Sequence, residues 1–149
     1  MVALVAAALL AAPTGVWHDA GTHLTLRHPA ALHVTTMELT GITDPVERVA
    51  LYSGAPPNAM VRPRAHQVIA ILMEQEPPLA ADVALFPPRP RRFRIRRLTM
   101  LEGFSGPRWG EITFRDHDRA FYIFVGVGSG ADAQVPGVLL ALDSLRVGP

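Results

Sequence analysis

Cysteine and lysine are both absent from this chain of 149 residues. Without cysteine there is no disulfide framework, no thiol nucleophile and no cysteine-ligated zinc or iron–sulfur site. All fourteen basic residues are arginine, and thirteen acidic residues leave a net charge of only +1. A total charge this small does not indicate a nucleic-acid-binding protein. With 18% charged and 49% hydrophobic residues, the chain is not intrinsically disordered, and its length suits one domain.

The first twelve residues form an apolar run that is too short to cross a membrane, because a transmembrane helix needs about 20 residues. Its length and small residues resemble the core of a signal peptide. No basic residue precedes the run, however, and no clean cleavage motif follows it. We interpret residues 1–15 as an apolar leader, which predicts an extracytoplasmic protein, secreted or envelope-associated and not lipid-anchored through cysteine. If the leader is instead a retained helix or strand, the same sequence predicts a cytoplasmic protein.

The remaining sequence predicts a mostly antiparallel sheet. Alternating or continuous apolar runs predict strands over residues 22–28, 32–38, 48–53, 66–73, 92–98, 109–115 and 119–127. The most apolar run, residues 121–125, is expected at the centre of the sheet. A polar turn at residues 116–118 joins the last two strands into a hairpin. Five prolines within residues 77–90 predict a stiff extended connector, with room for a short helical turn over residues 79–85.

Apolar residues near the carboxy terminus recur at intervals of three and four, which predicts an amphipathic helix. These residues are Val135, Val138, Leu139, Leu142 and Leu145. Asp132 is the expected N-cap, and Pro136 falls in the first turn, where a missing N–H group costs no hydrogen bond. We expect this helix to pack on the sheet, which gives an α+β fold.

Six of the arginines lie within residues 89–97. If residues 92–98 form a strand, alternation places Arg92, Arg94 and Arg96 on one face. A row of guanidinium groups about 7 Å apart could bind phosphates, anionic lipid head groups or carboxylates. These three arginines are therefore the candidate binding residues.

The alternative for this strand is a structural role. Phe93 and Ile95 would then face the core, while the arginines pair with carboxylates such as Glu111 and discourage edge-to-edge aggregation. Nucleic acid is a weak candidate ligand, because the exposed aromatic platforms that bind single strands are not evident.

Four histidines recur at intervals of five, at positions 18, 23, 28 and 33. On a strand this spacing alternates between the two faces, and on a helix it separates successive residues by about 140°, so neither arrangement clusters the imidazoles. A different site would arise if processing exposed Val16, since His18 would then be third in the chain and could complete a square-planar Cu(II) site. We predict no resident metal and no cofactor.

Residues 126–131 match a G-x-G-x-x-A pattern between a strand and a helix, as in dinucleotide-binding proteins. Only residues 145–149 follow the helix, so no βαβ unit can be completed, and a flexible corner is the preferred interpretation. Asp116, His117 and Asp118 are consecutive in a turn where strong pKa perturbation is not expected. No catalytic residue is identified, and we predict that the protein is not an enzyme.

Several stretches together resemble a family of uncharacterised exported actinobacterial proteins and, in outline, the Mog1/PsbP-like fold. They are residues 26–51, 86–95, 114–128 and 139–147. The resemblance covers residues 22–147 and implies one domain, an antiparallel sheet covered by helices in an α/β/α sandwich. Such folds serve elsewhere as non-catalytic partner-binding modules, but no partner-contact motif is transferable to this chain, and fold alone does not fix function.

Three hypotheses for the function follow. The first is a non-catalytic extracytoplasmic binding or accessory domain that contacts a protein partner. The second is binding to an anionic surface, lipid or wall polymer, through Arg92, Arg94 and Arg96. The third is an enzyme or metal-binding protein that uses His66, His117 or the amino-terminal histidines.

Overall fold

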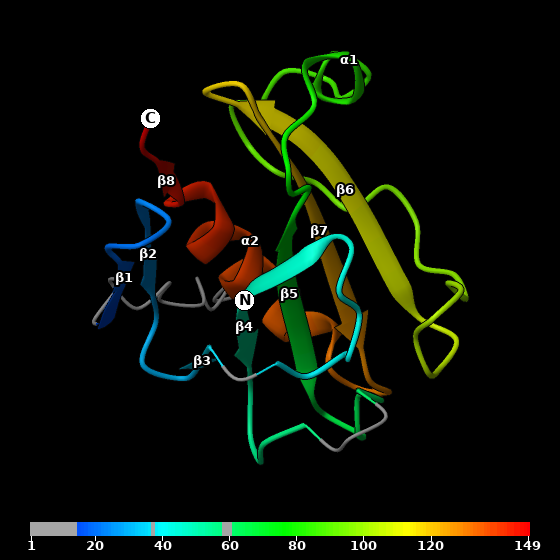
Figure 1. Cartoon of the computed structure of the whole chain (residues 1–149). Helices are drawn as coiled ribbons and strands as arrows, with labels where there is room; N and C mark the ends of the chain where they lie inside the picture. Colours follow the sequence, from blue (N-terminus) through cyan, green and yellow to red (C-terminus); the bar gives the residue numbers. More distant parts are fainter. Residues whose placement is uncertain (1–14, 37, 58–60) are drawn as a thin grey trace, which may run out of the picture.

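The computed structural model describes residues 15–36, 38–57 and 61–149, which form an α+β structure with mostly antiparallel sheets and few helices. A five-stranded sheet has the order β3-β4-β5-β7-β6, and a three-stranded sheet has the order β1-β2-β8 (Figure 1). The strands are β1 Gly15–Asp19, β2 Leu24–His28, β3 His33–Thr35, β4 Val46–Tyr52, β5 Val68–Glu74, β6 Trp109–Asp116, β7 Arg119–Val127 and β8 Arg146–Val147. The helices are α1 Ala80–Val83, the 3-10 helix η1 Asp132–Gln134 and α2 Val135–Asp143.

The central strand of the larger sheet is β5, which pairs with β4 on one side and β7 on the other. Every residue of β5 is buried, because both faces of the sheet are covered at this position. This explains why residues 68–73 of β5 are apolar without alternation. Residues 121–125 belong to β7, which is the neighbour of the central strand β5. The prediction that they form the centre of the sheet is therefore wrong. In β7, Tyr122 and Phe124 remain partly exposed on one face.

The two faces of the five-stranded sheet are covered by different elements. On one face, Val138, Ala141 and Leu142 of α2 and Leu24 and Leu26 of β2 belong to one buried cluster with residues of β4, β5 and β7. On the other face the cover comes mainly from loops, through Leu39, Ile42, Leu101 and Phe104, which pack on Ile69, Ile71 and Met73 of β5. Residues of α2 and β2 therefore share a buried cluster with strands of the sheet, and a second cluster contains residues of irregular chain.

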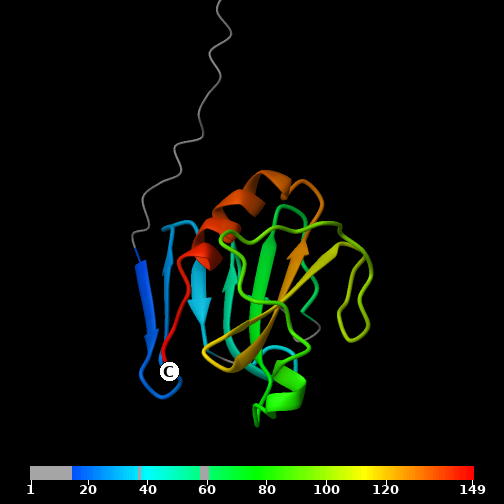
Figure 2. The same cartoon turned by 90° about the horizontal axis from the view of Figure 1, so that it is seen from above.

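The three-stranded sheet joins the two ends of the described chain. β1 pairs with β2, and β2 pairs with β8 near the carboxy terminus. The carboxy-terminal end lies beside the β1–β2 turn (Figure 2), where the Gly148 N–H group donates to the His23 carbonyl at 2.8 Å. β1 was not predicted, because its five residues carry only a short, mixed alternation. The leader predicted over residues 1–15 lies outside the described residues except for Gly15, which begins β1.

Two local predictions near the carboxy terminus are tested by the structure. α2 ends at Asp143, and Pro136 lies in its first turn as predicted. The predicted N-cap is wrong, because Asp132 lies in η1 and makes no capping hydrogen bond. Its carboxylate instead accepts a hydrogen bond from Arg108 Nη1 at 3.2 Å.

The β6–β7 hairpin confirms the predicted polar turn. His117 and Asp118 both have positive φ, +48° and +57°, which is the backbone of a two-residue type I′ turn. The turn aligns the strands so that Asp116 faces Arg119 and Trp109 faces Gly126. β6 thereby becomes the outer strand of the five-stranded sheet. Among the described residues, no helix is long and apolar enough to traverse a membrane.

Candidate functional site

Residues 90–98, which we call the arginine strap, run beside the outer edge of β6 (Figure 1). The chain is fixed to β6 just before and just after the strap. At the first end, the Arg89 N–H group donates to the Arg115 carbonyl at 3.0 Å, and the Arg115 N–H group donates to the Pro87 carbonyl at 2.8 Å. At the other end, Thr99 and Trp109 exchange two backbone hydrogen bonds of 2.9 and 2.8 Å.

The strand predicted over residues 92–98 does not form, and the spacing of the two attachments explains why. Arg89 and Thr99 are ten residues apart, but their partners Arg115 and Trp109 are only six apart on β6. The first attachment is a parallel bridge and the second an antiparallel one, so the chain changes direction relative to β6 between them. A regular antiparallel ladder also pairs residues one to one, so the surplus residues bow away from the edge. Pro88 and Pro90 also lack the N–H groups that a ladder requires.

The strap bows toward the α2 side of the sheet, because Phe93 is anchored there. The Phe93 ring is 3% exposed, and its centroid lies 5.0 Å from that of Phe114. Its N–H group donates to Asp143 Oδ1 at 2.7 Å, at the end of α2. Ile95 packs over Gly110, where a Cβ atom would lie 2.5 Å from Ile95 Cγ2. Glycine at position 110 therefore permits the close approach of the strap.

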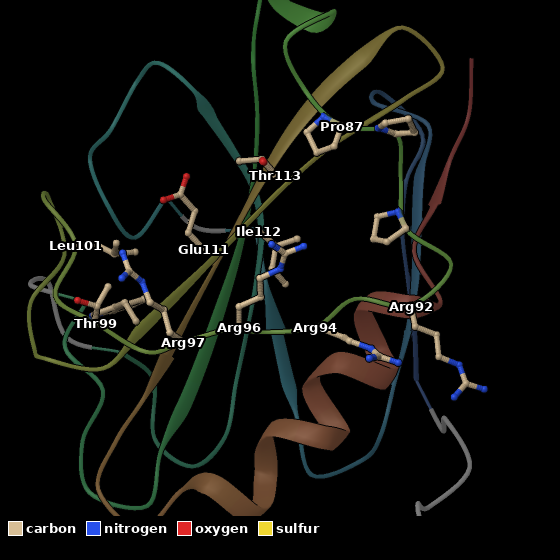
Figure 3. A pocket seen from close by; sticks show the side chains of 13 residues that line it. Pro87, Arg92, Arg94, Arg96, Arg97, Thr99, Leu101, Glu111, Ile112 and Thr113 are labelled. Carbon is tan, nitrogen blue, oxygen red and sulfur yellow. The ribbon is translucent and has the colours of Figure 1, made fainter.

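The predicted alternation of side chains survives without the strand. Phe93 and Ile95 face the protein, while Arg92, Arg94 and Arg96 are exposed. In Figure 3 the Arg96 side chain extends from the strap toward β6, whereas Arg92 extends away from it. The three candidate residues therefore share a segment but do not form one flat row, which the strand prediction had implied.

The strap arginines have no partners in the described part of the protein. No hydrogen bond or ion pair between described residues uses the side chains of Arg91, Arg92, Arg94, Arg96 or Arg97. The expected pairing with Glu111 is absent. Glu111 instead raises the pKa of Tyr122 on the neighbouring strand, together with Asp44 and Asp82, although burial is the larger cause of that shift. The Glu111 carboxylate points away from the strap in Figure 3.

A groove of about 850 Å³ lies between the strap and β6 (Figure 3). This volume falls within the range of about 300–1,000 Å³ that is typical of ligand sites. The groove is lined by arginines, by prolines of the preceding connector and by β6, namely Pro87, Pro88, Pro90, Arg92, Arg94, Arg96, Arg97, Thr99, Leu101, Trp109, Glu111, Ile112 and Thr113. No acidic residue occurs between Asp82 and Glu102, so the strap side of the groove carries only positive charge.

Backbone groups of β6 are also open at this groove. In an antiparallel pair, alternate residues direct their N–H and C=O groups toward opposite sides of the strand. Trp109 and Arg115 bond outward to the chain that flanks the strap, so Glu111 and Thr113, which have the same parity, also face outward. No hydrogen bond between described residues uses these outward groups. We call residues 111–113 the edge gap; its existence depends on the bowed strap, so sequence reasoning did not find it.

One arginine of the cluster has a structural role. Arg89 Nη1 lies 3.1 Å from Asp116 Oδ2, and Arg89 Nη2 donates to the Asp143 carbonyl at 3.3 Å. Its guanidinium carbon lies 5.5 Å from the centroid of the Phe93 ring, within the range of a cation–π interaction. The six-arginine run therefore contains one partnered anchor and five arginines without partners among the described residues.

A second ionic cluster lies at Glu74, the last residue of β5. Glu74 is 5% exposed and accepts hydrogen bonds from Arg48 Nε at 2.7 Å and from Arg119 Nε and Nη2 at 2.6 and 2.9 Å. Arg119 also donates to the carbonyls of Thr22 and Gly148, which ties the β1–β2 turn to the carboxy terminus. Arg48 also pairs with the Glu76 carboxylate, so two arginines face two carboxylates and the cluster has a structural role.

The histidines lie in separate environments. The His18 ring is 2.9 Å from the Thr25 hydroxyl, and the His33 ring packs on Tyr52 with centroids 5.3 Å apart. His66 lies against Gly130, and His117 occupies the β6–β7 turn. In the described ranges, no group of three or more histidine and acidic side chains is arranged to hold a metal ion.

The glycine-rich residues 126–131 form the corner between β7 and η1 and pack on the chain itself. A Cβ atom at Gly128 would lie 1.7 Å from the Arg64 carbonyl oxygen. The Gly128 N–H group donates to the Gln67 carbonyl at 2.8 Å, and the His66 N–H group donates to the Ser129 carbonyl at 2.7 Å. These glycines permit close backbone contact within the fold, which accounts for the dinucleotide-like pattern.

Comparisons with known protein families, curated proteins and solved structures give no match for this chain. The candidate site is therefore defined by its own geometry and charge. Its distinguishing feature is a groove that combines guanidinium groups and a strand edge for which the described residues provide no partners.

Proposed function

We propose that this protein is a non-catalytic binding or accessory domain that holds an anionic part of a protein partner in the groove beside the arginine strap. The observation that carries this proposal is the set of five exposed strap arginines without partners among the described residues. In the structural alternative these arginines would pair with neighbouring carboxylates, as Arg89 does. The strap side of the groove consists of guanidinium groups, prolines and backbone, which bind anionic ligands at neutral pH.

The proposal includes an extracytoplasmic location and a relationship to the Mog1/PsbP-like fold. The apolar residues 1–12 support the location. Support for the fold is the antiparallel sheet with α2 against one face. The opposite face argues against a full α/β/α sandwich, because its described helical cover is only the four residues of α1.

A charge-matched pair of variants tests this function. In the first variant, serine replaces Arg92, Arg94 and Arg96. In the second variant, serine replaces Arg27, Arg64 and Arg146, which are also exposed. Both variants lose the same three charges. Binding of fluorescent poly-glutamate is measured by anisotropy at low and high salt.

We expect the strap variant to bind about tenfold more weakly, since three exposed ion pairs at about 0.5 kcal/mol each amount to that factor. The control variant should bind nearly as well as the wild type, and salt should weaken the binding of both. Equal losses in the two variants would show that binding reflects net charge alone and would overturn the proposal. Wild-type binding to anionic vesicles but not to poly-glutamate would favour the anionic-surface alternative.

A further inference from the structure

The groove presents backbone hydrogen-bonding groups at the spacing of a β-strand. Glu111 and Thr113 each direct one N–H and one C=O group into the edge gap. Trp109 and Arg115, on either side of the gap, already have outward partners. Two donors and two acceptors are therefore open in the pattern that an added antiparallel strand requires.

We propose that the edge gap accepts a short, extended, acidic segment of a partner protein, which pairs its backbone with β6 and its carboxylates with the strap arginines. This inference rests on the proposed function and specifies its ligand and binding mode. Strand addition obtains affinity from main-chain hydrogen bonds and specificity from alternate side chains. Here the specificity comes from guanidinium groups along one side of the groove.

The carbonyl groups at the edge gap favour a peptide over other anions. The carbonyls of Glu111 and Thr113 need hydrogen-bond donors, which a peptide backbone provides at every non-proline residue. A phosphate diester, as in a lipid head group or a teichoic-type polymer, offers no comparable row of donors. The arginines would satisfy either kind of anion, so the backbone of β6 decides between them.

The dimensions of the site limit the bound segment to a few residues. Six residue steps separate Trp109 from Arg115, about 20 Å along a strand, and the open part covers only the middle of this length. About three or four residues can pair there. Phe93 and the two attachments hold the strap away from the edge without a ligand, so the gap is preformed and binding requires little reordering of the protein.

The experiment compares two isomeric peptides that differ only in the position of their N-methyl groups. The parent is a capped eight-residue peptide of alternating glutamate and threonine. One isomer carries N-methyl groups on its glutamates and the other on its threonines, so charge and composition are identical. In a strand, these two sets of N–H groups point to opposite sides, and only one set faces β6. Affinity for the wild-type protein is measured by competition with the labelled parent peptide.

We expect one isomer to bind at least tenfold more weakly than the parent, while the other retains most of its affinity. Equal affinities of the two isomers would overturn strand addition while leaving anion binding through the strap in place. No binding of the parent peptide, together with no binding of poly-glutamate, would overturn both proposals. Binding of anionic vesicles without binding of the parent peptide would overturn strand addition in favour of a surface ligand.

Discussion

Two groups of arginines in this protein have opposite relations to their surroundings. Arg48 and Arg119 are largely buried and converge on the carboxylate of Glu74, and Arg48 also pairs with Glu76, so that two carboxylates compensate the two guanidinium groups. The strap arginines are exposed, and none forms an ion pair with a described residue. Charge that is compensated internally stabilises the fold, whereas uncompensated surface charge is available to a ligand. The same residue type therefore has a structural role around Glu74 and a proposed binding role along the outer edge of β6.

The largest expected effect is the loss of the shared carboxylate. Glu74→Ala leaves Arg48 and Arg119 without their common partner in a nearly buried site, and removing one member of such a cluster is strongly destabilising. We expect the free energy of unfolding to fall by about 3 kcal/mol, measured by urea denaturation. The control is Glu111→Gln, an exposed position, where we expect a change within about 0.5 kcal/mol. A similar loss in both variants would remove the distinction between the two regions.

The same carboxylate predicts a dependence of stability on pH. Burial alone would raise the pKa of Glu74, but hydrogen bonds and charge from Arg119 and Arg48 outweigh it and hold the pKa below its ordinary value of 4.5. A carboxyl group with a lowered folded-state pKa stabilises the fold above its unfolded pKa, and this contribution disappears as the pH falls through the folded-state pKa. We expect the wild type to lose stability below about pH 4.5 more steeply than Glu74→Gln. Parallel urea midpoints of the two proteins from pH 6 to about pH 3 would contradict this assignment.

Arg89 should show an intermediate effect, because it belongs to the arginine run but is partnered. Arg89→Met keeps the aliphatic stem and removes the contacts with Asp116, the Asp143 carbonyl and the Phe93 ring. We expect a loss of about 1–2 kcal/mol in the free energy of unfolding, since an ion pair and a cation–π contact each contribute up to about 1 kcal/mol. The measurement is urea denaturation, and an unchanged midpoint would place Arg89 with the strap arginines.

The smallest stability effect is expected in the strap itself. The triple replacement of Arg92, Arg94 and Arg96 by serine removes no hydrogen bond or ion pair between described residues, so the free energy of unfolding should stay within about 0.5 kcal/mol of the wild type. Thermal and urea unfolding test this expectation. A loss of 2 kcal/mol or more, on the order of a core defect, would show that the strap arginines stabilise the fold and would weaken their proposed role in binding.

Most of the larger sheet could be predicted from local sequence patterns. The continuous apolar residues of β5 and the alternation in β6 indicate strands because one or both faces are buried. The turn at His117 and Asp118 was predicted because polar residues interrupt two apolar runs. The strap shows where this reasoning fails: its alternation is as regular as that of a strand, and it does separate Phe93 and Ile95 from the arginines. Alternation reports which side chains are buried and does not report whether the backbone is paired.

The sequence predicted the arginine-rich segment of the candidate site but not the edge gap beside it. The density of arginine in residues 89–97 identified the segment. Arg92, Arg94 and Arg96 are exposed, but they do not lie on one side as the strand prediction implied. The edge gap was not predicted, because it depends on attachments at Thr99 and Arg89 to residues of β6. The sequence of either segment alone does not show which residues of β6 these attachments contact.

The sequence by itself determined the α+β class, most of the strands, the helix near the carboxy terminus and the position of the arginine run, because these follow from local periodicity and composition. Only the tertiary structure decided which arginines are compensated. That outcome depends on distances between side chains far apart in sequence, such as Arg119 and Glu74, and on how the chain closes around them. It also decided that ten residues of chain must lie along six residues of β6, which leaves the arginine strap bowed and part of the strand edge open.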